Sequence, residues 1–295
     1  MEYIPAKTII TNKKETSWFG TEFNMNIYKG CCHGCIYCDS RSECYHVDNF
    51  DTVRAKEHAL MIIRDELRRK TKSGVVATGA MSDPYNPFEK ELELTRHALE
   101  LIDAYGFGVA IATKSPLITR DIPILQCIAQ HSPVLCKITI TTIDDATGKI
   151  IEPHVALSSE RFEAIRKLRE AGIYTGILFM PMLPFITDSN ENILGMVQLA
   201  KEAGANFIYP SFGVTLRSNQ RDHFYQKLDE NFPGVKEKYI AKYGLTYQCG
   251  IPNAKAKYEK FALACQQNKI YYTMSDIILD YKRAYTCKQM SIFDY

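Results

Sequence analysis

The sequence predicts an α/β protein with a parallel sheet, because six short strands alternate with helices between residues 23 and 210. The predicted strands are short apolar or β-branched segments, and longer segments whose apolar residues repeat with helical spacing lie between them. Parallel strands joined by helices form βαβ units. Periodicity alone leaves two architectures open, an incomplete (β/α)6 barrel and a doubly wound sheet.

The elements predicted in the first half of this pattern follow a strand at Phe23–Tyr28 that leads into a cysteine-rich loop. A helix is expected over residues 53–72, where five apolar residues recur at helical spacing: Ala55, Ala59, Ile62, Ile63 and Leu67. The next elements are a buried strand at Gly74–Gly79, a helix at Glu91–Tyr105, a strand at Phe107–Thr113 and a helix at Thr119–Gln130.

The second half begins with a β-branched strand at Cys136–Thr142. The elements that follow are a helix at Ser159–Ala171, a strand at Ile173–Met180, a helix that begins at Asp188 and ends at Gly204, and a strand at Asn206–Pro210. After about residue 217 the pattern is helical and rich in tyrosine, with no clear strand. We therefore expect a core over residues 1–216 and a mainly helical C-terminal extension with a tail over 217–295.

The composition is that of an ordinary globular protein, with 46% hydrophobic and 24% charged residues, and it excludes a disordered or fibrous chain. A net charge of +2 indicates no strong overall attraction to nucleic acid. The sequence shows neither a signal-peptide pattern nor an apolar stretch of the ~20 residues that cross a bilayer. We expect a cytoplasmic protein without a membrane segment, in which clustered cysteines serve a metal or redox role.

Three cysteines lie close together with the spacing CxxxCxxC: Cys31, Cys35 and Cys38. Thiolates select zinc, Cu(I) or iron–sulfur clusters. A [4Fe–4S] cluster normally takes one thiolate on each of its four irons, so three thiolates would leave one iron open. The alternative is a zinc site with His33 or Cys44 as the fourth ligand. Cys32 is out of register with the triplet.

The cysteine spacing, the aromatic Tyr37 before the third cysteine and the position after a first strand resemble the radical SAM superfamily. In that superfamily the open iron binds the amino and carboxylate groups of S-adenosylmethionine (SAM), and reductive cleavage of a C–S bond releases a 5′-deoxyadenosyl radical. The resemblance implies a partial (β/α)6 radical SAM barrel that carries a [4Fe–4S] cluster and SAM and receives electrons from a low-potential donor.

Further segments resemble the family of spore photoproduct lyase, also described as DNA repair photolyase-like: Met81–Glu89, Thr113–Pro116, Thr139–Thr142, Ile151–Pro153 and Leu168–Gly172. The match spans roughly residues 20–215 in order and spacing. It implies lesion repair or modification of nucleic acid as the favoured function. Radical modification of a peptide or small molecule, and a non-catalytic nucleic-acid-associated iron–sulfur or zinc protein, remain the alternatives.

The same resemblance implies contacts to SAM. The end of the second strand places Gly79, Ser82 and Asp83 near the SAM amino group, and Ser82 and Asp83 are equally good turn formers. Lys114 is expected at the SAM carboxylate. The remaining candidates are Thr139 or Thr141 at the ribose hydroxyls and Tyr37 beside the adenine, although all three also suit ordinary strand or core positions.

The chain departs from the lyase at its hydrogen-return relay. The family's lyase returns hydrogen through a cysteine near the end of the second strand and two tyrosines flanking the third cluster cysteine. Here Met81 lies at that strand end, and Asp39 occupies one tyrosine position. The relay is therefore broken, and Cys44, Cys249 or Cys265 would have to supply a thiol from elsewhere if they are not simply packed residues.

Two segments late in the chain suggest contacts to partners. Tyr209–Phe212 is followed by Arg217 and Arg221, and aromatic and arginine side chains suit bases and phosphates, or any polar pocket. Gln289–Phe293 (QMSIF) resembles the Q-L-S-L-F peptide by which bacterial repair and replication proteins bind the sliding clamp. This tail could equally pack on its own domain.

Overall fold

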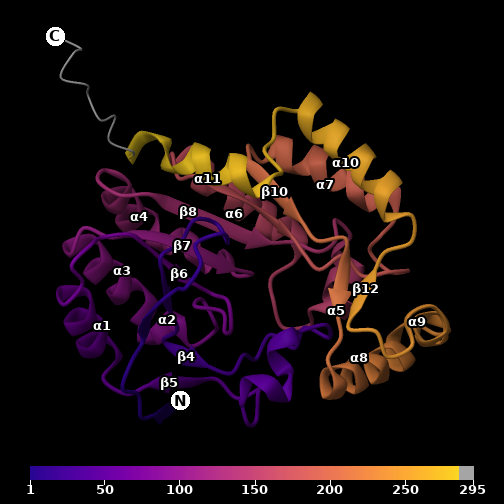
Figure 1. The fold of residues 1–295 in the computed structure, drawn as a ribbon, viewed down its shortest axis with the longest axis horizontal. Coiled ribbons are helices and arrows are strands. Elements are labelled where there is room, and N and C mark those ends of the chain that lie inside the picture. The colour runs from indigo at the N-terminus through magenta and orange to yellow at the C-terminus, as the bar shows by residue number, and fades with distance from the viewer. Residues whose placement is uncertain (286–295) are drawn as a thin grey trace.

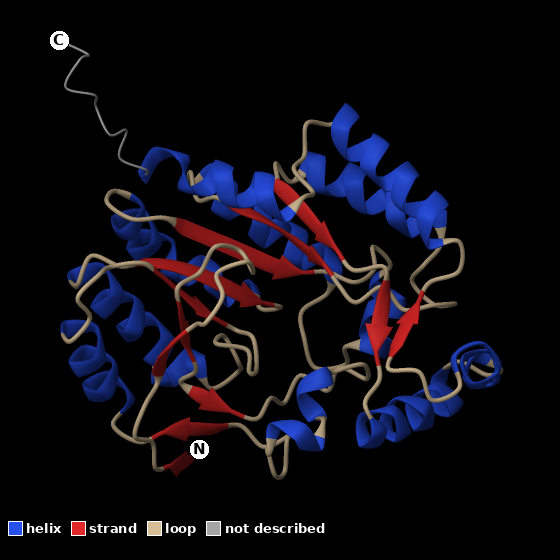
Figure 2. Ribbon diagram, viewed as in Figure 1, coloured by secondary structure: helices blue, strands red, loops and turns tan. Residues whose placement is uncertain are grey.

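A computed structural model describes residues 1–285 of the chain. Its main sheet has the order β10-β9-β8-β7-β6-β3-β2. The parallel strands are β3 (Phe23–Met25), β6 (Val75–Thr78), β7 (Gly108–Thr113), β8 (Val134–Thr139), β9 (Thr175–Phe179) and β10 (Phe207–Pro210). They neighbour one another in chain order, whereas a doubly wound sheet reverses its order. The fold is therefore an open, partial (β/α)6 barrel, as predicted (Figures 1 and 2).

Helices cover the outer face of this sheet, where the largest hydrophobic core lies between the two layers. They are α1 (Ala59–Arg68), α2 (Glu89–Leu92), α3 (Leu94–Ala104), α4 (Ile122–Ala129), α5 (Asp145–Ile151), α6 (Ser158–Glu170) and α7 (Asn190–Glu202). Along β8, Cys136 and Ile138 face this core, so that Leu135, Lys137 and Thr139 face the interior.

A second, small sheet corrects two predictions near the N-terminus. It pairs β1 (Glu2–Ile4) with β5 (Arg54–Lys56) and β5 with β4 (Tyr28–Lys29). The segment Phe23–Tyr28 is thus divided between two sheets, and the start of the predicted helix 53–72 is a strand. The antiparallel strand β2 (Ile10–Asn12) forms one edge of the main sheet.

Several other boundaries differ from the prediction for local reasons. Glu93 has a left-handed backbone (φ 49°), which separates α2 from α3. A short 3₁₀ helix at Pro116–Asp121 precedes α4. The N-cap of α7 is Ser189, whose hydroxyl accepts from Asn192 N at 3.0 Å, whereas Asp188 pairs with Lys257 at 2.7 Å. The remaining short 3₁₀ helices are Asp39–Arg41, Glu43–Tyr45 and Arg283–Tyr285.

The C-terminal part contains helices α8 (Ser218–Asn231), α9 (Val235–Tyr243), α10 (Ala254–Gln267) and α11 (Met274–Lys282). The expectation of no clear strand after residue 217 is wrong, because β12 (Gln248–Gly250) pairs with β11 (Gly213–Thr215). Figure 2 shows these two strands beyond the arrowheads of β8 and β9. Helix α10 packs against α7 (Figure 1). None of the helices in residues 1–285 has the length and apolar composition that a bilayer crossing requires.

The loop between β2 and β3 fills the open side of the barrel. Trp18 packs edge-on against Tyr209 of β10, with ring centroids 5.3 Å apart, and Phe19 packs against Phe207 at 5.9 Å. Helix α11 stabilises the position of this loop, because the Tyr281 hydroxyl donates to Phe19 O at 2.7 Å. Aromatic packing thus connects this loop to β10, the strand at the far end of the main sheet.

Candidate active site

The cysteine loop follows β4 and is fixed by backbone hydrogen bonds to distant segments. Cys31 N donates to Phe50 O at 2.8 Å, and Ile36 N donates to Ile151 O at 3.0 Å. Gly30 has φ 80°, and a Cβ atom there would lie 2.2 Å from Thr52 O, so the turn into the loop requires glycine. These constraints set the positions of the three cysteines.

Cys31, Cys35 and Cys38 line one small cavity of about 90 Å³, together with residues from the carboxyl ends of β6, β7 and β8. Burial, with the nearby charge of Asp83, raises the pKa of Cys31 to about 12, and burial also raises the pKa of Cys35 and Cys38. Such thiols become thiolates only when a cationic centre binds them. Cys32 does not line this cavity.

The small cavity brings together three thiols, the number that a [4Fe–4S] cluster with one open iron takes, each on a different iron. Within residues 1–285, no three His, Cys, Asp or Glu side chains lie close enough together to hold a single metal ion. The zinc alternative required such a group. Cys44, one of its proposed ligands, is exposed and lies outside the small cavity. His33, the other, lines that cavity with the three cysteines and lies 3.6 Å from Asp83.

Asp83 lines the small cavity, but both of its carboxylate oxygens already accept hydrogen bonds. Oδ1 accepts from Thr113 Oγ1 at 2.6 Å and from Tyr85 N at 2.9 Å, and Oδ2 accepts from Lys114 N at 2.8 Å. The hydroxyl of Ser82 donates to Gly30 O. These two residues therefore tie the end of β6 to the end of β7 and to the cysteine loop.

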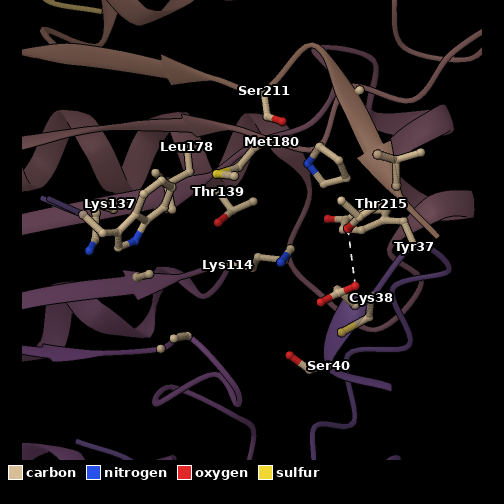
Figure 3. Close-up of a pocket in the computed structure, with 18 of the residues that line it drawn as sticks. Tyr37, Cys38, Ser40, Lys114, Lys137, Thr139, Leu178, Met180, Ser211 and Thr215 are labelled. Carbon is tan, nitrogen blue, oxygen red and sulfur yellow. Dashed lines mark hydrogen bonds between the residues drawn. The ribbon is translucent and has the colours of Figure 1, made fainter. Parts of the chain in front are cut away.

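Lys114, Gly79 and Thr139 line both this cavity and a larger one beside it. Burial alone would lower the pKa of Lys114, but the neighbouring groups Cys35 and Glu152 raise it above its ordinary value. Figure 3 shows its ammonium group within the site, between Thr139 and Cys38. Gly79 has φ 91°, and a Cβ atom there would lie 1.8 Å from Ala112 O.

Thr141 does not share the position of Thr139. Strand β8 ends at Thr139, and Thr141 lines neither cavity. Its hydroxyl is buried and makes no hydrogen bond to the described residues. The expectation that both threonines follow one face of the same strand is thus wrong, because the strand stops two residues earlier.

Tyr37 is held by a buried ion pair that the sequence analysis did not identify as functional. Its hydroxyl donates to Glu152, whose other oxygen lies 2.6 Å from Arg161 Nη1. Burial alone would raise the pKa of Glu152, but Arg161 and Lys114 lower it below its ordinary value. The only sequence signal for this pair was Glu152 within the Ile151–Pro153 segment.

The larger cavity has a volume of about 1090 Å³ and extends from Cys38 along the barrel interior to Trp18. Three lysines line it, Lys13, Lys114 and Lys137. Figure 3 shows Lys137 and Cys38 on opposite sides of the site, with Lys114 and Thr139 between them. Sequence analysis missed Lys137 and Trp18, although strand alternation placed Lys137 on the face of Thr139.

Of the three relay positions, Met81 and Asp39 supply neither a thiol nor a tyrosine, whereas Tyr37 is present and lines the large cavity. Asp39 accepts from the Tyr45 hydroxyl at 2.7 Å and pairs with Arg217 at 3.2 Å, and the sulfur of Met81 lies 4.0 Å from Ser40 Oγ. Cys265 is buried in the main core. Cys249 lines the large cavity, and its thiol donates to Thr246 O at 3.7 Å beside an apolar cluster.

The residues proposed late in the chain for substrate contacts have different roles in the structure. Arg221 is buried and donates to the backbone oxygens of Leu216, Leu245 and Thr246, so it stabilises the fold. Tyr209 does not line the cavity, whereas Phe212 does.

A sequence model of the Radical SAM superfamily matches residues 25–200, more than half of the chain. An uncharacterised protein of Mycobacterium tuberculosis is 30% identical over 228 residues, which cover 75% of this chain and 67% of the relative. An uncharacterised protein of Methanocaldococcus jannaschii is 30% identical over 217 residues, covering 72% of this chain and 78% of the relative.

Among solved structures, a variant of spore photoproduct lyase matches with a TM-score of 0.66 and 14% identity, covering 92% of this chain and 82% of that chain. The same lyase complexed with dinucleoside spore photoproduct matches with a TM-score of 0.64 at 14% identity, with the same two coverages. At this identity the likeness shows a shared fold.

Proposed function

Because this chain belongs to the radical SAM superfamily, and is therefore a radical SAM enzyme, we propose that it modifies or repairs nucleic acid through a site built on Cys31, Cys35 and Cys38. When bound, the [4Fe–4S] cluster and SAM supply reductive C–S cleavage and a 5′-deoxyadenosyl radical that abstracts a substrate hydrogen. The three thiols would hold the cluster, and a low-potential donor would supply the electron.

The roles of the protein side chains follow from their positions. The ammonium group of Lys114 is available to the SAM carboxylate, since it makes no hydrogen bond or ion pair within residues 1–285. Thr139, on the neighbouring strand, presents a hydroxyl for the ribose. Asp83, whose oxygens are already occupied, positions Lys114 through its backbone.

The observation that carries this proposal is the continuity of the two cavities. Cys38, Gly79, Lys114 and Thr139 line both, so chemistry beside the cysteines occurs at the wall of a chamber of about 1090 Å³. That volume accommodates a cofactor-sized ligand together with a nucleoside. Nucleic acid is favoured because the lyase that shares this fold has been solved with a dinucleoside photoproduct.

The test is an anaerobic reaction of reconstituted protein with SAM, a reductant and either irradiated or undamaged DNA. We expect 5′-deoxyadenosine and an altered nucleoside by mass spectrometry, both lost in Cys35→Ala. Formation of 5′-deoxyadenosine without any change in DNA, but with a changed peptide or small molecule, would contradict the substrate class. No 5′-deoxyadenosine under any condition would contradict the reaction.

The clamp-binding segment Gln289–Phe293 lies outside the described residues and stays a prediction. Binding of a Lys288–Tyr295 peptide to a bacterial sliding clamp, lost when Phe293 is replaced by alanine, would support it.

A further inference from the structure

A buried lysine without an acidic partner faces the large cavity at the end away from the cysteines. Lys137 is only 3% exposed, and its ammonium group makes no hydrogen bond or ion pair within residues 1–285. It lies over the ring of Phe19, 4.6 Å from the centroid. A buried cation without a partner is costly, and a bound anion would offset that cost.

The neighbouring strand β7 leaves room beside this lysine. In the sheet register, Lys137 lies opposite Ala112 of β7 and Gly176 of β9. Ala112 is small and lines the cavity, whereas Phe207 fills the space next to Gly176, so the cavity is open beside Lys137 on the β7 side. Leu135, two residues before Lys137 on β8, belongs to the apolar cluster that closes the amino-terminal end of the barrel, which we call its floor.

A second lysine and an aromatic surface border the same end of the cavity. Lys13 Nζ donates to Thr21 Oγ1 at 2.7 Å and to Trp18 O at 3.4 Å, which are both neutral acceptors. Trp18 is 41% exposed, and its ring meets Phe19 edge-on at 5.0 Å. Tyr209 meets the same ring at 5.3 Å, so a planar ligand would contact the exposed remainder of the indole.

The described side chains that line this cavity carry more positive than negative charge. The one acidic side chain among the described residues that line it is Asp39, at the cysteine end, and Arg217 already neutralises it. Glu22 does not line the cavity, and its charge raises the pKa of Lys13 against the effect of burial. Its carboxylate, however, already binds Lys282 at 2.9 Å and Val75 N at 2.6 Å. Burial, with the charge of Lys13, lowers the pKa of Lys137 to about 7, and a bound anion would raise it again.

We propose that Lys137 and Lys13 bind a phosphate group of a nucleotide substrate and that Trp18 stacks on an adjoining base. Ammonium groups bind phosphate as point charges, and bases stack on aromatic side chains whatever their sequence. The inference rests on the proposed function and adds to it the orientation of the nucleotide in the cavity. The phosphate lies at the floor of the barrel, and the nucleoside extends from there toward Lys114 and the cysteines.

Binding can be measured without SAM, reductant or turnover, because Trp18 is the single tryptophan of the chain. The full-length protein is titrated with the thymidine dinucleotide TpT and with the same dinucleotide carrying an uncharged methylphosphonate linkage. We expect TpT to quench the fluorescence and the uncharged analogue to bind at least tenfold more weakly. Comparison of thymidine monophosphate with a short single-stranded oligonucleotide then distinguishes a free nucleotide from a DNA backbone.

Lys137→Met should weaken TpT binding at least tenfold while the protein remains folded, since it removes a buried charge and keeps the chain length. Lys255→Met, which removes an exposed lysine on α10, is the matched control and should bind normally. If Lys137→Met does not fold, Lys13→Met and the methylphosphonate comparison decide.

Equal binding of the charged and uncharged dinucleotides, or full affinity in a folded Lys137→Met, would overturn the assignment. Quenching by an acidic peptide in place of TpT would overturn it too. A failure here leaves the SAM cleavage assay unaffected, and a failure of SAM cleavage leaves this binding result unaffected, so the two proposals fail separately.

Discussion

The hydroxyl of Tyr37 donates a hydrogen bond to Glu152, a residue 115 positions later in the chain. Tyr37 lies between two of the cysteines, and Glu152 ends α5 and pairs with the buried Arg161 of α6. The cysteine loop is thereby anchored to the helical layer through a charged group inside the protein. Such a pair contributes little net stability when intact but is costly to break.

Glu152→Gln should therefore destabilise the protein, because it leaves the Arg161 guanidinium buried beside a neutral amide. We expect a loss of about 3–5 kcal/mol in the free energy of unfolding, measured by denaturant titration. Glu163→Gln breaks an exposed pair with Arg166 and serves as the control, for which only a small change is expected. Equal losses in the two variants would show that burial of the pair is unimportant.

Anaerobic reconstitution should load about four irons per chain. Alanine at Cys31, Cys35 or Cys38 should abolish the cluster absorbance and most of the iron, because each thiol lines the small cavity. Cys32→Ala is the control and should load normally. If Cys32→Ala lost the cluster to the same extent, the ligand assignment would be wrong.

Lys114→Ala should weaken SAM binding while the cluster remains intact. A charge-assisted hydrogen bond contributes roughly 1.5–3 kcal/mol, which corresponds to about a tenfold to hundredfold loss of affinity by calorimetry. Lys90→Ala, at an exposed position of α2, is expected to bind SAM as the unmodified protein does. Unchanged affinity in Lys114→Ala would remove this residue from the SAM site.

The binding of a phosphodiester should depend on pH through Lys137, whose pKa is lowered from 10.5 to about 7 by burial and by Lys13, against a small opposing effect of Cys136. The anion binds the protonated amine, so affinity should be greatest below pH 7 and fall as pH rises above it. Lys137→Arg, which keeps its charge, should bind with a flat profile between about pH 6 and pH 9. A flat profile in the unmodified protein would contradict the prediction.

The lowered pKa of Lys137 also makes the stability of the folded protein depend on pH. Between pH 7 and 10.5 the unfolded chain holds a proton on Lys137 that the folded chain has released, so this residue makes stability rise with pH there. The rise should be reduced in Lys137→Met, as measured by denaturant titration at several pH values.

The protein should not convert the spore thymine photoproduct to two thymines over many turnovers. Met81 offers no S–H bond, and the carboxylate of Asp39 is held by Arg217 and Tyr45. Chromatography with mass spectrometry of the lesion-containing dinucleotide measures the yield. Clean repair at many turnovers per chain would show that another residue returns the hydrogen.

Much of the fold could be predicted because its strands and helices carry local patterns. The β-branched segments that became β7, β8 and β9 lie within a few residues of their predicted bounds. Arg54–Lys56 is different, since its strand conformation comes from pairing with Tyr28 and with Glu2–Ile4, segments distant in the chain. Helical spacing of apolar residues could not reveal that pairing.

The candidate site shows the same division between local and distant information. The cysteines could be identified because all three lie within one short loop. The role of Asp83 could not, because its hydroxyl partner, Thr113, lies 30 residues further along and meets it only when β6 and β7 pair. Lys137 was detectable as a charged residue in a β-branched strand, but its lack of an acidic partner emerged only from the folded structure.

The support of Phe19 by Tyr281 has a consequence for the order in which the protein can mature. During synthesis the N-terminal segments leave the ribosome first. Phe19 emerges early, yet the hydroxyl that fixes its backbone lies 262 residues later. A chain terminated before α11 could still pair its six parallel strands but would leave Phe19 and Phe207 without their apolar cover. Helix α11, which is translated after all six parallel strands, therefore completes this end of the chamber, and a chain that stops before α11 leaves it open.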